Sequence, residues 1–328
     1  MPRIFAYIVH QAGVADDTAA ELIAVAKKID AAASPTAIVI GWGADLDAVC
    51  ATLRASYTEV WKIAHESLAY PNAELIRKAL VKVLPPGSIV LVPHEHFGID
   101  LAPGLSIKLN AAFVSDVVAI DGVEGNELKV VRQEFGGQVS AHVRCDVSSG
   151  AVVTLRPGAF QPLQSAAANG TIVDKSSEVG VLAAGRRYLK TITAVAGDVD
   201  ITKHNVLVSI GRGIQEKDNV AIAQELADTL GAAVSCSRPV VDAKWLDSSR
   251  QVGSSGKTVR PKVYLACGIS GAFQHLAGIK GNPFIVAINK NPKAPIFQVA
   301  DVGIVDDILE FIPELTNKVR ELRSVAAK

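Results

Sequence analysis

The chain has 328 residues, of which 49% are hydrophobic and 5% aromatic, and its 33 basic and 33 acidic side chains leave no formal net charge. This length accommodates two domains of ordinary size, and the neutral balance gives no electrostatic reason to expect nucleic acid or an anionic membrane as a partner. The four cysteines form no CxxC pair, which argues against a metal site or a disulfide framework. The start, MPRIFAYIVHQAG, lacks a secretion signal, and no apolar run approaches the ~20 residues of a membrane helix, so we expect a soluble, cytoplasmic protein.

The first half of the chain alternates segments typical of strands and helices. Strands are predicted at residues 3–9, 37–41, 59–63 and 88–93, and helices at 18–29, 45–56 and 72–83. This rhythm predicts an α/β domain with a mainly parallel sheet that helices cover on both faces. Between residues 116 and 155, short apolar runs separated by Gly, Asn and Ser predict additional strands and hairpins.

The segment His94-Glu95-His96 follows the last of these parallel strands. On extended backbone the two histidines would share a face, as a pair of metal ligands must. A metal site needs about three protein ligands, so we expect a loop without a metal here.

A second domain is predicted to begin near residues 197–204, which divides the chain into residues 1–197 and 198–328. Strands are expected at 205–210, 232–236, 263–267, 285–288 and 302–305, with a helix at 219–230 that ends at Gly231. Five such strands predict a doubly wound parallel sheet, in which ligands bind at the carboxyl ends of the strands.

Polar residues follow all five of these strands. They are Arg212 between two glycines, Ser237-Arg238, the turn Gly268-Ile269-Ser270-Gly271 with Gln274 and His275 after it, Asn289, and Asp306-Asp307. The loop DSSRQVGSSGKT adds hydroxyls and amides, although it lacks the spacing of a P-loop. Each segment has a structural alternative: an exposed turn, an Arg238–Asp242 ion pair, a solvated hairpin tip, or a helix cap at Ser270 with His275 on the surface. Because all of them converge on one edge, and GISG is expected to open a helix there, the pattern favours a ligand site.

Three segments, SRPVVDAKWL, RQVGSSGKTVRPKVYLACGISGAFQHLAG and IVAINKNPKAPIFQVADVGIVDD, resemble the alpha subunit of electron transfer flavoproteins. The resemblance covers residues 206–315, whereas the first domain is similar only in length and in its α/β character. Two positions depart from the family pattern: Asn291 stands where Asp is common, and Ser254 stands where Gln is common.

The resemblance implies a heterodimer. The N-terminal domain would pack on a beta subunit that binds AMP or a second FAD, and the C-terminal domain would hold one FAD. The implied FAD contacts are Arg212, Ser237, Arg238, Gln251, Val252, Gly253, Ser254, Ser255, Gly268, Ile269, Ser270, Gly271, Ala272, Gln274, His275, Asn289, Asp307 and Ile308. Among these, Arg238, Ser255 and His275 are expected to tune the flavin potential. No residue is expected to act as a nucleophile or general base, because the cofactor carries the reaction.

The implied function is electron transport. The chain would take electrons from a dehydrogenase, such as an acyl-CoA dehydrogenase of fatty acid beta-oxidation, and pass them to a quinone oxidoreductase through the FAD semiquinone. One alternative is an NADH-dependent, electron-bifurcating flavoprotein with a second FAD in the beta subunit. Another is a non-redox sensor or scaffold that binds adenine nucleotides.

Overall fold

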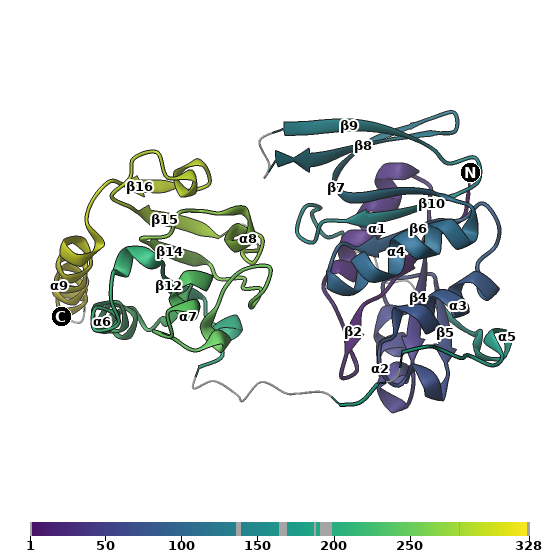
Figure 1. The fold of residues 1–328 in the computed structure, drawn as a ribbon, viewed down its shortest axis with the longest axis horizontal. Coiled ribbons are helices and arrows are strands. Elements are labelled where there is room, and N and C mark those ends of the chain that lie inside the picture. Colours follow the sequence, from purple (N-terminus) through teal and green to yellow (C-terminus); the bar gives the residue numbers. More distant parts are fainter. Residues whose placement is uncertain are drawn as a thin grey trace. The chain divides into compact units, whose positions relative to one another are not determined.

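A computed structural model describes residues 2–135, 139–163, 169–186, 188–190, 199–281 and 283–326. The chain divides into two compact units, Met1–Lys190 and Thr191–Lys328, which are shown in Figure 1. The domain boundary predicted between residues 197 and 198 lies outside the described residues. Within the described ranges, no helix is both long enough and apolar enough to cross a membrane.

The N-terminal unit is built on a nine-stranded sheet in the order β11-β5-β4-β1-β6-β10-β7-β8-β9. Parallel pairing joins the strands from β11 to β7, whereas β7, β8 and β9 form an antiparallel meander. The strands are β1 Ile4–Tyr7, β4 Thr36–Gly41, β5 Glu59–Ala64, β6 Ile89–Pro93, β7 Ala112–Glu124, β8 Glu127–Glu134, β9 Val139–Asp146, β10 Ala151–Leu155 and β11 Thr171–Asp174, with a separate small hairpin of β2 His10–Gln11 and β3 Val14–Ala15. The predicted mainly parallel α/β sheet is confirmed.

Helices cover both faces of this sheet and bury a separate apolar cluster on each. The helices are α1 Thr18–Ile29 and α2 Ala44–Leu53 on one face, α3 Ala73–Val83 and α4 His96–Leu109 on the other, and the shorter α5 Ser176–Val179 and η1 Glu66–Leu68. Successive side chains of β1 alternate between the clusters: Ile4 and Ala6 face α1 and α2, whereas Phe5 and Tyr7 face α3 and α4. Because both faces of such a central strand are buried, its sequence is a continuous apolar run.

The helix α4 was not predicted, because Gly98, Pro103 and Gly104 interrupt its pattern. Both glycines allow close packing. A Cβ at Gly98 would collide with the backbone carbonyl of Pro93, and a Cβ at Gly104 would lie 2.5 Å from the guanidinium of Arg77. The helix therefore packs closely against the end of β6 and against α3.

The C-terminal unit contains five parallel strands in the order β13-β12-β14-β15-β16. They are β12 Val206–Ile210, β13 Ala233–Cys236, β14 Val263–Cys267, β15 Phe284–Ile288 and β16 Val302–Ile304. The predicted parallel sheet is confirmed. The predicted helix is α6, Val220–Leu230, and it ends at Gly231, whose φ is +66°.

The two faces of this smaller sheet are covered differently. Helices α6 and α9, Ile308–Ala326, pack on one face. The other face is covered by loops and single turns, which contribute Val252, Val259, Ile269 and Ile296 to a second apolar cluster. The short elements of the unit are η3 Ile201–Lys203, η4 Arg212–Ile214, α7 Arg238–Asp242, η5 Ser248–Arg250, α8 Phe273–Leu276 and η6 Pro295–Gln298. Loops thus replace one of the two layers of long helices that a doubly wound sheet normally has.

Candidate functional site

The carboxyl ends of the five strands in the C-terminal unit lie in one row. The register pairs Ile210 with both Cys236 and Cys267, and it pairs Ile288 with Cys267 and Ile304. The segments that follow these residues therefore begin side by side on one edge of the sheet. This edge is called the rim, and it comprises residues 211–215, 237–242, 247–258, 268–276, 289–293 and 305–308.

Two rim segments pack backbone against backbone through glycine. A Cβ on Gly213 would lie 2.6 Å from the Cα of Gly268, and Gly213 N donates to Gly268 O at 3.1 Å. Gly271 packs in the same way against the backbone of Ile296. Glycine is therefore needed here for the close approach of neighbouring loops. This packing fixes the rim segments relative to one another.

Six of the predicted contact residues have exposed polar side chains. They are Arg212, Arg238, Ser254, Ser255, Ser270 and Gln274. The two guanidinium groups carry positive charge, and the hydroxyl and amide groups both donate and accept hydrogen bonds. Such a set of donors suits an extended anionic ligand that has polar ring edges.

Arg238 is the first residue of α7, and its Nε lies 3.5 Å from Asp242 Oδ2. The ion pair that the sequence offered as a structural alternative is therefore present. The two side chains are 69% and 63% exposed, so the pair contributes little to stability and leaves the guanidinium accessible.

One buried side chain supports the loop at residues 251–258. Gln251 is 6% exposed, and its Nε2 donates to Ser255 Oγ at 2.9 Å. A Cβ at Gly253 would lie 2.8 Å from the carbonyl oxygen of Gln274, and Ser254 N donates to the same oxygen at 2.7 Å. The loop is thereby held against the segment that contains α8.

His275 is buried rather than on the surface. Its Nδ1 lies 3.1 Å from Val252 O, and its Nε2 lies 2.9 Å from the hydroxyl of Tyr264. Burial lowers the pKa of His275 to about 4, so the imidazole is neutral at pH 7. Any influence of His275 on a ligand would therefore come from its dipole or hydrogen bonds. Since α8 has a single turn, it offers much less of a helix dipole than the sequence pattern suggested.

Asn289 and Asp307 have structural partners where the sequence predicted ligand contacts. Asn289 Nδ2 donates to a backbone carbonyl at 2.9 Å. Asp307 Oδ1 accepts from Leu309 N at 3.0 Å at the start of α9, and Asp307 Oδ2 lies 2.6 Å from Lys290 Nζ. These contacts within the protein account for both side chains, and their contribution to ligand binding stays a prediction.

Several predicted contact residues point their side chains into the protein. Ser237, Val252, Ile269 and Ile308 are at most 6% exposed, and Ile308 packs in the cluster under α9. A contact between these side chains and a ligand stays a prediction.

A polar cluster in the N-terminal unit was missed by the sequence reasoning. Asp116 accepts two hydrogen bonds from Arg156, at 2.9 and 2.5 Å, and its Oδ1 lies 3.9 Å from His94 Nε2. No local signal pointed to this cluster, because Asp116 lies in β7 whereas His94 and Arg156 follow β6 and β10. His96 begins α4, so the two histidines do not share one extended segment. Among the described residues, no group of three His, Cys, Asp or Glu side chains could hold a metal ion.

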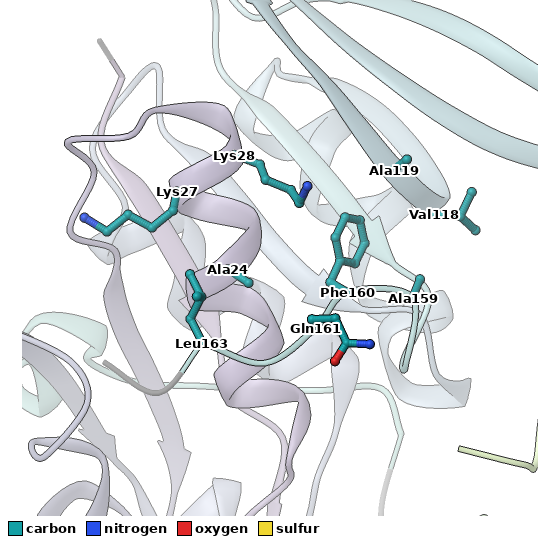
Figure 2. Close-up of a pocket in the computed structure, with 9 residues that line it drawn as sticks. All are labelled: Ala24, Lys27, Lys28, Val118, Ala119, Ala159, Phe160, Gln161 and Leu163. Carbon is teal, nitrogen blue, oxygen red and sulfur yellow. The ribbon is translucent and has the colours of Figure 1, made fainter. Parts of the chain in front are cut away.

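A cavity of about 420 Å³ also lies in the N-terminal unit, between α1, β7 and the segment after β10. Its lining residues are Ala24, Lys27, Lys28, Val118, Ala119, Ala159, Phe160, Gln161 and Leu163. Figure 2 shows that the ammonium ends of Lys27 and Lys28 point in different directions. The two lysines therefore do not form one anion site.

Family models match both units. Residues 4–179 match the electron transfer flavoprotein domain, and residues 200–280 match the electron transfer flavoprotein FAD-binding domain. The sequence motifs had shown the resemblance to this family only in the C-terminal unit. The first match shows that the N-terminal unit also resembles the family.

Curated relatives agree with these matches. The electron transfer flavoprotein subunit alpha of Methylophilus methylotrophus is 36% identical over 321 residues, which cover 96% of this chain and 98% of that protein. The subunits alpha of Thermoanaerobacterium thermosaccharolyticum and Clostridium acetobutylicum are each 39% identical, over 236 and 237 residues. These two alignments cover 72% and 71% of this chain and 72% and 70% of the relatives.

Proposed function

The chain belongs to the electron transfer flavoprotein alpha-subunit family, and we propose that it is the FAD-carrying subunit of a heterodimeric electron carrier. Its C-terminal unit is the FAD-binding domain of the family, so FAD is its cofactor. In this proposal electrons arrive from a dehydrogenase, such as an acyl-CoA dehydrogenase, and leave to a quinone oxidoreductase. The observation that carries the proposal is the row of exposed, donor-rich side chains along the rim of this unit.

The rim residues fit FAD by the chemistry of their side chains. Arg212 and Arg238 would supply positive charge for the pyrophosphate or for the ring system. The hydroxyls and amide of Ser254, Ser255, Ser270 and Gln274 would donate to the polar ring edge and the ribityl chain. FAD supplies the electron-accepting chemistry when bound.

The rim supports a carrier rather than a stand-alone oxidoreductase. The structure describes all of the rim segments, and His275 is their one histidine. Both of its ring nitrogens are hydrogen-bonded to protein atoms. Burial raises the pKa of Cys236 and Cys267, at the ends of β13 and β14, to about 12, which makes these thiols inert. Neither His275 nor these two thiols is therefore available at the rim to activate a substrate as an acid or a base.

The family implies a beta subunit as partner, and we place the contact with it on the N-terminal unit. Purification of the chain together with its beta subunit, followed by a count of FAD and AMP per heterodimer, tests the proposal. One FAD with AMP, and bleaching of the flavin absorbance by a reduced acyl-CoA dehydrogenase, is the expected result. Two FAD and bleaching by NADH would replace the proposal by the bifurcating alternative. A colourless complex that binds adenine nucleotides would overturn it in favour of the sensor.

A further inference from the structure

Three strands of the C-terminal sheet bury hydroxyl groups on the same face, where the surrounding residues are apolar. Tyr264 of β14 is completely buried, as are Ser209 of β12 and its cross-strand neighbour Ser235 of β13. Burying a hydroxyl is costly unless it is hydrogen-bonded, and phenylalanine would fill the place of Tyr264 without that cost. Packing alone therefore does not explain a tyrosine at this position.

Tyr264 links the sheet to His275. The phenol oxygen lies 2.7 Å from Ser209 Oγ and 2.9 Å from His275 Nε2, and His275 Nδ1 lies 3.1 Å from Val252 O. These contacts form a continuous chain from the middle of the sheet to the loop at residues 251–258.

The contact between His275 Nδ1 and Val252 O determines which atoms of the chain carry the protons. A carbonyl oxygen only accepts, so His275 must carry its proton on Nδ1 to bond Val252. In the neutral ring Nε2 is then an acceptor, and Tyr264 must donate to it. Since the phenol has a single proton, Ser209 in turn donates to the phenol oxygen. The other neutral tautomer would set two acceptors, Nδ1 and Val252 O, against each other.

We propose that Tyr264 is a positioning residue of the flavin site, which acts through His275 to hold the loop of Val252, Ser254 and Ser255 in its binding conformation. The inference rests on the proposed function, because it assumes that this loop contacts the FAD. Tyr264 lies beneath the rim, and only its hydroxyl is needed for the effect.

The test uses the full-length chain purified with its beta subunit. Tyr264→Phe removes one hydroxyl and should raise the dissociation constant of FAD roughly tenfold. A tenfold change corresponds to about 1.4 kcal/mol, which is the usual contribution of one hydrogen bond. Hydrogen exchange should accelerate in the peptide that covers residues 251–258 and stay unchanged in β15. Tyr57→Phe is the matched control, because Tyr57 is equally buried in the N-terminal unit, where its hydroxyl donates to Ala19 O at 2.6 Å. This control should leave FAD binding unchanged.

A double-mutant cycle separates positioning from loss of general stability. If Tyr264 acts through His275, then Tyr264→Phe should have no further effect on FAD binding in a His275→Leu background. Full additivity of the two effects, or a wild-type dissociation constant in Tyr264→Phe, would overturn the inference while the proposed function stands. Failure of the wild-type heterodimer to bind FAD would instead contradict the proposed function.

Discussion

Gly213 and Gly268 pack against each other so closely that a Cβ added to Gly268 would lie 2.7 Å from the Cα of Gly213. The φ of Gly268 is +65°, which an L-residue with a side chain adopts only with strain. Two separate requirements therefore meet at one residue of the rim: a left-handed backbone and a close contact between loops.

We predict that Gly268→Ala lowers the free energy of unfolding by about 3 kcal/mol, because about 1–2 kcal/mol of backbone strain adds to an overpacked contact. The variant should also lose most of its FAD, since the two rim segments must separate. Urea denaturation and the flavin content of the purified heterodimer are the measurements.

Gly231→Ala is the control for that prediction. Gly231 has nearly the same φ, +66°, but no atom lies within 4 Å of an added Cβ. Only the strain of about 1–2 kcal/mol should remain, and the FAD content should be normal. Equal losses in the two variants would show that the contact between the loops is unimportant.

Arg238 is the exposed cation of the rim for which the family resemblance implies a role at the flavin. Arg238→Ala should lower the potential for uptake of the first electron by on the order of 100 mV, because a charge lost at a partly hydrated site is worth about 2 kcal/mol. Asp242→Ala, which removes the partner of Arg238 but keeps the cation, should leave the potential equal or slightly higher. Spectroelectrochemical titration of the three proteins decides the matter, and an unchanged potential in Arg238→Ala would exclude the tuning role.

The strands of both units could be read from the sequence because buried parallel strands are continuous apolar runs, such as residues 89–93 and 263–267. The place of the rim followed as well, since parallel strands bring their carboxyl ends to one edge. The helix α4 could not be read in this way. Its Gly98 is explained by the close approach to the carbonyl of Pro93, five residues earlier, and its Gly104 by the contact with Arg77 of α3, and neither contact can be seen before the chain is folded.

The roles of individual rim residues were less predictable than their position. An aspartate after a strand can contact a ligand or cap a helix, and the sequence does not distinguish the two at Asp307. The burial of His275 depends on Tyr264 and Val252, which belong to other segments of the unit. Contacts of this kind appear only once the chain is folded.

The hydrogen bond from Leu309 N to Asp307 Oδ1 predicts a capping role for Asp307 in α9. Asp307→Ala should lower the free energy of unfolding by about 1 kcal/mol, the usual effect of losing an N-terminal cap. Asp307→Asn keeps the cap and loses only the charge beside Lys290, so its stability should be close to that of the wild type. If Asp307→Asn instead binds FAD much more weakly at normal stability, the carboxylate contacts the cofactor.

The buried imidazole of His275 predicts a loss of stability in mild acid. Its pKa is about 4 in the folded protein, against an ordinary value of 6.5, because burial disfavours the charged form. Between these two pH values the unfolded chain binds more protons than the folded one, so the free energy of unfolding falls as the pH falls through this window. From pH 7 to pH 5 this residue should account for a loss of about 2 kcal/mol in the free energy of unfolding.

Burial also lowers the pKa of His94, which acts in the same direction. The contribution of His275 must therefore be measured as a difference between the wild type and a variant that lacks this histidine. The difference between the urea midpoints at pH 7 and pH 5 should therefore be larger for the wild type than for His275→Gln. An equal pH dependence in both proteins would show that His275 is not buried as a neutral ring.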